Sequence, residues 1–203
     1  MIISTVLSAI INLLLFAAVP FLGYIIYQKW RNKRTFREIT RRAGLRIGKW
    51  QYLAYSVGLS CITVAALIAW PPPMDMLAKP GSAAHDFVGL GLTGPALAMA
   101  LIYGVIQAGL TEELLFRGLI AGSLGRRLPI VWANIIQAVL FLLPHLLLLR
   151  IMPDIWGLLL LVFAYGLVAG WLRIKSGSIA GPWLIHACAD TTVAMIVAVH
   201  TIG

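Results

Sequence analysis

Ionisable side chains stand close together in the stretch TEELLFRG, residues 111–118, within an otherwise apolar segment. A charged side chain at the centre of a bilayer costs about 2.5–3.5 kcal/mol on insertion scales, so such residues need either a partner or a chemical task. Glu113 and Arg117 are four residues apart, which places them on one helix face as a potential ion pair. Glu112 points about 100° away from Glu113 around a helix and has no partner in the local sequence. We therefore expect its partner to come from another segment.

Two later apolar segments supply histidines. FLLPH places Phe141 and His145 on one helix face, with Pro144 interrupting the helical hydrogen bonds, and HACAD places His186 and Asp190 on one face. An intramembrane histidine more often forms a hydrogen bond between helices than acts as a catalyst. A histidine and an aspartate on one helix face can also simply hydrogen-bond to each other. Each motif alone is therefore weak evidence for catalysis.

The combination of the three motifs is stronger evidence. In lipid, ionisable groups on separate spans are driven towards the interior of the bundle, where they converge. A buried carboxylate can then act as a general base on water, and imidazoles can stabilise an oxyanion. Such a pocket suits hydrolysis of an amide at membrane depth.

The motifs EELLFR, FLLPH and HACAD, in this order, resemble the E-E-x-x-x-R, F-x-x-x-H and H-x-x-x-N/D motifs of the CPBP family, also called Abi or CAAX-protease-like. FRG after the glutamates and SGSIAGPWLIH before the second histidine also fit. The resemblance covers about residues 111–190, the predicted catalytic region, while the amino-terminal third is supported by hydropathy alone.

The resemblance implies an intramembrane endopeptidase that acts on a membrane-associated protein or peptide. By position in the motifs, Glu112 would activate the attacking water and His145 would help to orient it. His186 and Asp190 would form the side of the site that stabilises the oxyanion. Glu113, Arg117 and Phe141 would be supporting residues.

We expect no cofactor, because for this family we favour a glutamate-based mechanism without metal. Zinc is the alternative, since a glutamate and two histidines also make a zinc-binding set. Its ligands would be Glu112, His145 and His186.

Position 190 departs from the more common asparagine of the family. An ionised aspartate accepts hydrogen bonds but cannot donate one to an oxyanion. We predict that Asp190 orients His186 and favours its protonated form, which would leave the imidazolium to donate.

The composition indicates an integral membrane protein with an all-α fold. The chain of 203 residues is 61% hydrophobic and 11% charged, with mean hydropathy +0.92, far from the roughly 25% charged residues of soluble domains. Apolar segments of spanning length predict a single membrane domain over 1–203, a polytopic helix bundle of about six spans. The expected spans are 3–27 (a retained span, since no basic residue precedes Lys29), 50–70, one within 87–124, 130–149, 155–172 and 179–200. Gly94-Pro95 interrupts the third run, so part of it is a candidate for a separate interfacial piece.

The net charge of +9 indicates topology rather than nucleic-acid binding. Nine of the sixteen basic residues lie between Lys29 and Lys49, where few aromatic side chains are available to stack on bases. Cytoplasmic loops are rich in Lys and Arg, so we predict that the loop 29–49 is cytoplasmic and contacts anionic lipid headgroups. No nucleic-acid partner is expected.

One observation complicates the protease hypothesis, and two alternative functions remain open. His145 is about five residues from the outer end of its span, which for parallel helices leaves it roughly 10 Å or more from the depth of Glu112. The alternatives are a family member without catalytic activity that serves as a scaffold or regulator, and a small proton-coupled transporter, although the sequence lacks the internal repeat common in transporters. Cys61, Cys188, His85 and His200 receive no role.

Overall fold

The computed structural model describes residues 2–150 and 152–200, and every regular element in these ranges is helical. The helices are α1 (Ile2–Asn12), η1 (Leu13–Ala18), α2 (Val19–Asn32), α3 (Phe36–Arg42), α4 (Trp50–Ala69), α5 (Met74–Leu77), η2 (His85–Phe87), α6 (Gly94–Leu101), η3 (Ile102–Leu110), η4 (Glu113–Ala121), α7 (Gly122–Leu124), α8 (Ile130–His145), η5 (Leu146–Arg150), α9 (Trp156–Ser176) and α10 (Ala180–Val199).

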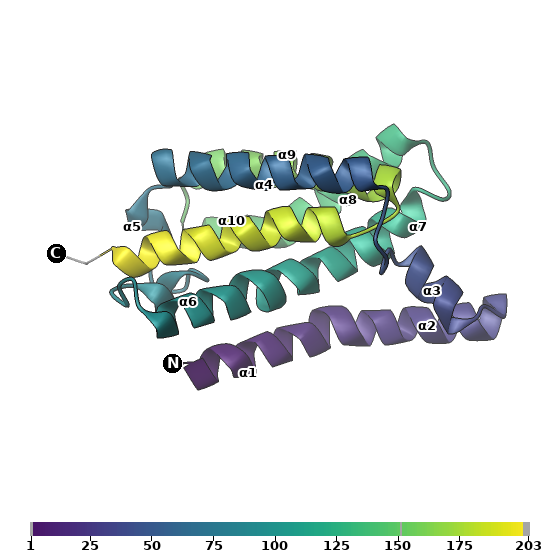
Figure 1. The fold of residues 1–203 in the computed structure, drawn as a ribbon, viewed down its shortest axis with the longest axis horizontal. Coiled ribbons are helices and arrows are strands. Elements are labelled where there is room, and N and C mark those ends of the chain that lie inside the picture. Colours follow the sequence, from purple (N-terminus) through teal and green to yellow (C-terminus); the bar gives the residue numbers. More distant parts are fainter. Residues whose placement is uncertain (1, 151, 201–203) are drawn as a thin grey trace.

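In the described part of the chain, six helical rods are long and apolar enough to cross a membrane. They are 2–32, 50–69, 94–124, 130–150, 156–176 and 180–199. The rods alternate in direction, so the start of α1 and the end of α10 both lie at the end of the bundle opposite α3 (Figure 1). The predicted all-α, polytopic bundle is confirmed.

The third rod begins at Gly94, so the apolar run 87–124 is interrupted at Gly94-Pro95 as predicted. Pro95 occupies the first turn, where its missing N–H removes no helical hydrogen bond. The side chain of Thr93 accepts a hydrogen bond from the backbone N–H of Ala96 at 3.3 Å and caps the helix. Residues 88–93 therefore lie outside the rod, while residues 94–124 form one continuous rod.

Wide π-helical turns occupy much of the third rod, in η3 and η4. Such turns are rare and occur mostly near functional sites. Gly104 lets η3 approach α10, because a Cβ atom at this position would lie 2.7 Å from the backbone nitrogen of Thr191. The indole of Trp183 on α10 donates a hydrogen bond to the carbonyl of Val105 at 2.7 Å. The π-helical rod is thereby fixed against the helix that carries His186.

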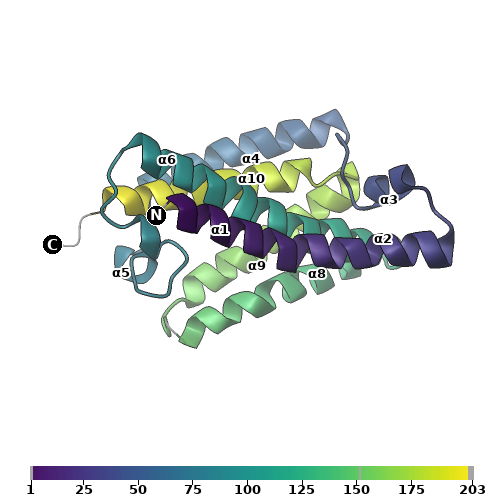
Figure 2. The same ribbon diagram turned by 90° about the horizontal axis from the view of Figure 1, so that it is seen from below.

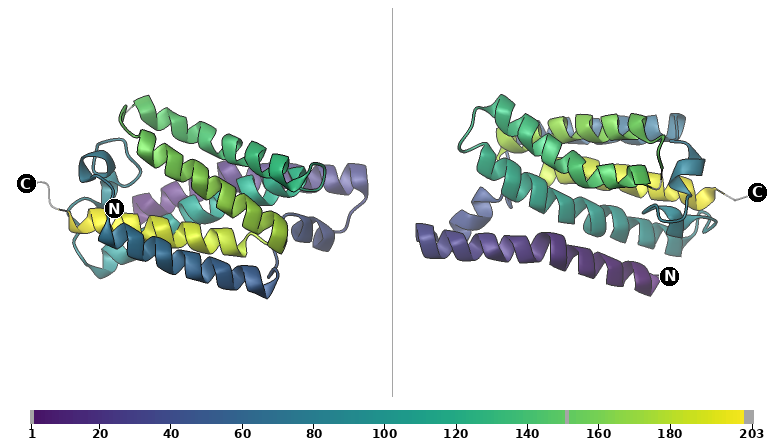
Figure 3. Two further views of the ribbon diagram at one scale, coloured as in Figure 1. Left: turned by 90° about the horizontal axis from the view of Figure 1, so that it is seen from above. Right: turned by 180° about the vertical axis from the view of Figure 1, so that it is seen from behind.

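Small residues bring α8 and α9 together in the same way. A Cβ atom added at Gly166 would meet that of Ala138 at 3.2 Å. Next to this contact, the side-chain amide of Gln137 donates to the carbonyl of Gly166 at 2.6 Å, and that of Asn134 donates to the carbonyl of Leu167 at 2.9 Å. The pair runs obliquely to α10 (Figures 2 and 3).

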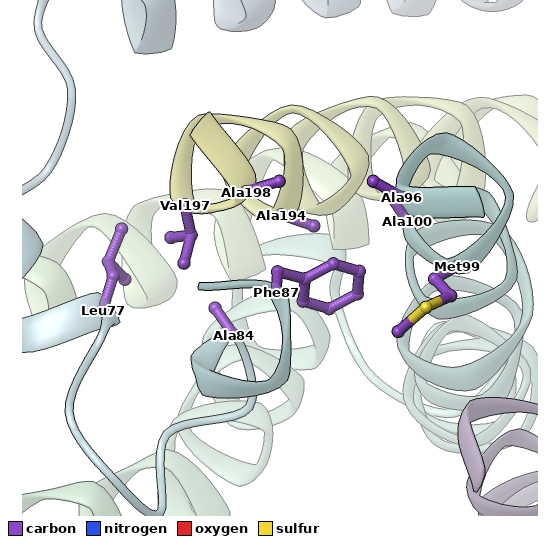
Figure 4. Packing of buried hydrophobic residues seen from close by; sticks show 9 residues of the cluster. All are labelled: Leu77, Ala84, Phe87, Ala96, Met99, Ala100, Ala194, Val197 and Ala198. Carbon is purple, nitrogen blue, oxygen red and sulfur yellow. The ribbon is translucent and has the colours of Figure 1, made fainter. Parts of the chain in front are cut away.

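A hydrophobic cluster fixes the loop before the third rod against the ends of α6 and α10 (Figure 4). Its buried members are Leu77, Ala84, Phe87, Ala96, Met99, Ala100, Ala194, Val197 and Ala198. The loop also donates a backbone hydrogen bond from Gly91, which has a φ of 65°, to the carbonyl of Ala198 at 2.7 Å. Since glycine adopts positive φ without strain, this residue allows the loop to satisfy a carbonyl near the end of α10. The cluster thus holds together two of the rods that carry the motif residues.

Candidate active site

Glu113 is the centre of a buried polar cluster. Its side chain is completely buried, and its Oε1 lies 3.0 Å from Nη1 of Arg117 and 2.9 Å from Nδ1 of His186. The hydroxyl of Tyr165 also donates to Oε1 at 2.8 Å. The ion pair predicted from the i, i+4 spacing is present, and it is linked to α9 and α10.

Arg117 is held by aromatic rings as well as by Glu113. Its guanidinium carbon lies 3.9 Å from the centroid of the Phe141 ring and 5.0 Å from that of Tyr165. A cation over the face of an aromatic ring is stabilised by the ring quadrupole. These rings compensate only in part for the burial of Arg117, because its three guanidinium nitrogens are buried and have no hydrogen-bond partner.

Glu112 finds its partner on α10. Its Oε2 lies 3.9 Å from Nε2 of His186, while Glu113 contacts the other ring nitrogen of the same histidine. The two consecutive glutamates therefore lie on either side of one imidazole. They differ in access, because the side chain of Glu112 is 29% exposed and that of Glu113 is 0% exposed.

Asp190 also faces Nε2 of His186, with its Oδ2 at 3.4 Å. The imidazole thus has a carboxylate against Nδ1 and two carboxylates on the side of Nε2. The side chain of His186 is 10% exposed. On the Nε2 side, the side chains of Glu112 and Asp190 are 29% and 25% exposed, although Oε2 of Glu112 is itself buried without a hydrogen-bond partner.

His145 joins the cluster through Phe141. The ring centroids of Phe141 and His145 are 4.8 Å apart, and those of Phe141 and His186 are 6.3 Å apart. Nδ1 of His145 lies 2.9 Å from the carbonyl oxygen of Phe141. Because a carbonyl only accepts hydrogen bonds, Nδ1 of His145 is the donor in this contact.

The depth difficulty expected for His145 is removed by the arrangement of the helices. The ring of Phe141 lies 4.8 Å from that of His145 and 6.3 Å from that of His186, whose Nε2 lies 3.9 Å from Glu112, so His145 belongs to the same cluster as the carboxylate. The oblique course of α8 (Figure 2) departs from the parallel helices on which the expected mismatch was based.

Tyr165 was missed by the sequence analysis. Its hydroxyl has two acceptors within reach, Oε1 of Glu113 at 2.8 Å and the carbonyl of Pro182 at 3.0 Å, and its ring is 5.2 Å from that of His186. A tyrosine within an apolar span carries no charge and belongs to no motif named above. Only the fold brings it to the glutamates.

The zinc alternative does not fit the arrangement of its three candidate ligands. Within residues 2–150 and 152–200, no group of three His, Cys, Asp or Glu side chains is placed to hold a metal ion. No step of the mechanism below is therefore assigned to a metal, and a chelator provides the direct test.

Comparison with known proteins adds one finding. Residues 94–192 match the family model described as type II CAAX prenyl endopeptidase Rce1-like. This matched segment, called the CPBP segment, confirms the predicted resemblance to the CPBP, or CAAX-protease-like, family. Searches among curated proteins and among solved structures returned no match.

The CPBP segment contains each of the polar residues described in this site. It begins with α6 and ends within α10, so it covers the π-helical rod and both histidine-bearing rods. The first two rods, 2–32 and 50–69, lie outside it. The match of this segment supports an intramembrane protease of the CAAX type in general.

Proposed function

We propose that the protein is an intramembrane endopeptidase that hydrolyses a peptide bond in a membrane-associated protein or peptide, with Glu112 as the general base. The observation that carries the proposal is the difference between two adjacent glutamates. Glu113 is fully buried and engaged with Arg117, whereas Glu112 is partly exposed and faces an imidazole. Only a group that substrate and water can reach can act as the base.

The reaction balances with the residues present. The carboxylate of Glu112 takes one proton from a water molecule, and the resulting hydroxide attacks the carbonyl carbon of the substrate. The carbonyl π electrons move to the oxygen, which becomes an oxyanion. When the carbon–nitrogen bond breaks, Glu112 returns the proton to the leaving nitrogen, which leaves a carboxylic acid and an amine.

His186 is proposed to stabilise the oxyanion from Nε2. Glu113 accepts from Nδ1 at 2.9 Å, which fixes the orientation of the ring, as a buried carboxylate does for a catalytic histidine elsewhere. Asp190 lies on the Nε2 side and cannot itself donate a hydrogen bond. Its role is to keep a proton on Nε2, from which the ring donates to the oxyanion.

His145 is proposed to position the attacking water. Its Nδ1 is committed to the carbonyl of Phe141, so Nε2 can accept a hydrogen bond from that water. With Glu112 taking the other proton, the two acceptors orient the oxygen lone pair towards the substrate.

The substrate class follows from where the site lies. The residues are carried by spans that are apolar enough for the membrane interior, so the scissile bond must belong to a chain anchored in or at the membrane. The family suggests a carboxy-terminal or juxtamembrane bond.

Cleavage by the purified protein tests this function. The wild type is reconstituted in liposomes with membrane-anchored peptides, and we expect cleavage that falls at least about 100-fold in Glu112→Gln, because a general base contributes about 10²–10⁴-fold. The matched control is Glu38→Gln, which removes a carboxylate on α3 outside the site and keeps a residue suited to the capping box. Equal cleavage by Glu112→Gln and wild type would overturn the proposal.

Two further arms separate the alternatives. Added chelator leaves the wild-type rate unchanged if no metal takes part, and abolishes it if zinc does. Proton uptake into the liposomes without peptide cleavage would favour the transporter. Absence of both proton uptake and cleavage would favour the scaffold.

A further inference from the structure

An arginine-rich cavity lies at the end of the bundle that contains α3, away from the glutamates. Its volume is about 390 Å³, and it is bordered by the loop and short helix after α2, by α7 and by the end of α9. Its charged lining consists of Arg34, Arg41, Arg42, Arg46, Arg126, Arg173 and Glu38. The cavity lining therefore carries six arginines and one glutamate.

The positive charge in this cavity has no ion-pair partner in the described part of the chain. Within residues 2–150 and 152–200, no ion pair joins any of these six arginines to a carboxylate. Arg173 is only 5% exposed, and its Nε has no hydrogen-bond partner, as is also true of Nε of Arg42. A buried guanidinium that lacks a counter-ion is costly, and its unpaired N–H groups favour binding of an anion.

Glu38 does not neutralise this charge. Its carboxylate accepts hydrogen bonds from the backbone N–H and the hydroxyl of Thr35, at 2.8 and 2.9 Å. These bonds, followed by the charges of Arg34 and Arg42, lower the pKa of Glu38. The carboxylate therefore caps α3 and leaves the guanidinium groups unpaired.

The arginines are held in place by neutral acceptors. The carbonyl of Arg42, at the end of α3, accepts from Nη2 of Arg173 at 2.7 Å and from Nη1 of Arg126 at 3.1 Å. Arg46 donates from Nε to the carbonyl of Gly177 at 3.0 Å. Burial first, and then the charges of Arg42 and Arg34, lower the pKa of Arg126. The like charges are thus held near one another by the backbone.

Glycines keep the cavity open to these side chains. A Cβ atom at Gly122 would lie 2.6 Å from Nη2 of Arg173, and one at Gly44 would lie 2.7 Å from its Nε. Gly44 also has a φ of +83°, which glycine adopts without strain. Any side chain at either position would displace the buried guanidinium.

We propose that this arginine cavity is a binding site for a phosphate-bearing anion at the membrane surface. Guanidinium groups present paired N–H donors that match phosphate oxygens, and several of them are needed for a group that carries more than one negative charge. The cavity lies where the rods 94–124 and 156–176 end, which is the height of lipid headgroups. The same chemistry can come from a phospholipid or from a soluble phosphate.

Binding measurements on the full-length protein test this site and do not require catalysis. One arm titrates detergent-purified protein with phosphatidic acid or phosphatidylcholine and counts bound lipid by native mass spectrometry. A second arm titrates inorganic pyrophosphate into protein held in phosphatidylcholine nanodiscs and follows the heat of binding. Saturable binding in the first arm, with phosphatidic acid preferred over phosphatidylcholine, identifies a lipid, whereas binding in the second identifies a soluble phosphate.

Matched arginine variants locate the site. Arg41→Gln and Arg126→Gln remove charges from the cavity lining, whereas Arg37→Gln on the same helix as Arg41, and Arg127→Gln next to Arg126, remove charges outside it. We expect each lining variant to weaken binding about fivefold, from about 1 kcal/mol per basic residue, and each control to change it less than twofold. Because Arg41 is exposed, its variant tests the site even if Arg126→Gln does not fold.

Two results would overturn the inference. Equal loss of affinity in lining and control variants would show that diffuse charge attracts the anion. If phosphatidic acid binds no better than phosphatidylcholine and pyrophosphate does not bind, the cavity holds no phosphate group.

Discussion

At the scale of single residues, burial separates two glutamates that the sequence presents as equals. Glu113 accepts contacts from Arg117, His186 and Tyr165 with one oxygen, and such a carboxylate is a positioning group. Glu112 keeps part of its side chain exposed beside Nε2 of His186. Their order along the chain therefore matters less than which of them the π-helical rod leaves accessible.

Replacement of Asp190 tests its proposed effect on His186. We expect Asp190→Asn to lower the rate of peptide cleavage about tenfold and to shift the pH–rate profile, because a charged acceptor is worth about 1.5–3 kcal/mol in a hydrogen bond. The profile is measured on reconstituted protein, with Asp154→Asn, an exposed loop position, as the control. An unchanged rate and profile would remove Asp190 from the mechanism.

Replacement of Tyr165 tests the support of Glu113. Tyr165→Phe keeps the ring against Phe141 and His186 and removes the hydroxyl that donates to Oε1 of Glu113. We expect the free energy of unfolding to fall by about 1.5–3 kcal/mol, the value of a hydrogen bond to a charged group. Thermal unfolding in detergent measures it, and the exposed Tyr55→Phe on α4 is the control. Equal losses in both variants would show that the hydroxyl of Tyr165 adds nothing.

At the scale of helices, hydropathy locates the rods well because spanning length and apolarity are local properties. The predicted span 50–70 corresponds to Trp50–Ala69, and the predicted span 179–200 corresponds to Ala180–Val199. The π-helical turns of η3 and η4 are not predictable in this way, because they depend on contacts with α10 such as the bond from Trp183 to Val105. Tyr165 and Arg173 escaped notice for the same reason, since their partners are distant in sequence.

Close contact between α8 and α9 is predicted to be necessary for the site, since Phe141 and Tyr165 belong to these two helices. A Cβ atom at Gly170 would lie 2.6 Å from Cδ of Gln137. We expect Gly170→Leu to destabilise the protein by about 1–3 kcal/mol through overpacking and to reduce cleavage. Gly58→Leu is the matched control, because a Cβ atom there meets nothing within 4 Å. Thermal unfolding of the two variants should differ; the same transition temperature for both would contradict the packing account.

At the scale of the whole molecule, the chain is an integral membrane protein with an uneven charge distribution. The basic residues of 29–49 gather at the end of the bundle where α3 lies, and the start of α1 and the end of α10 lie at the other end (Figure 1). The positive-inside rule then predicts that the α3 end is cytoplasmic. That side would also carry the arginine cavity.

Cysteine labelling tests this orientation. In a variant without Cys61 and Cys188, single cysteines are introduced at the exposed Arg37 and Asp154. Arg37 belongs to α3, and Asp154 belongs to the connection between α8 and α9, which lies at the other end of the bundle (Figure 3). In intact cells a membrane-impermeant maleimide should modify Asp154→Cys, and it should reach Arg37→Cys only after permeabilisation. The opposite pattern would reverse the topology.

The central claim is that polar groups from separate membrane rods act together around Glu112 to split a polypeptide. Its most direct measurement is the comparison of membrane-protein termini, by mass spectrometry, in cells that contain either the wild type or an equally abundant, folded Glu112→Gln. The account predicts new termini from at least one membrane-associated protein in the wild type and their absence in the variant. Identical sets of termini in both would contradict it.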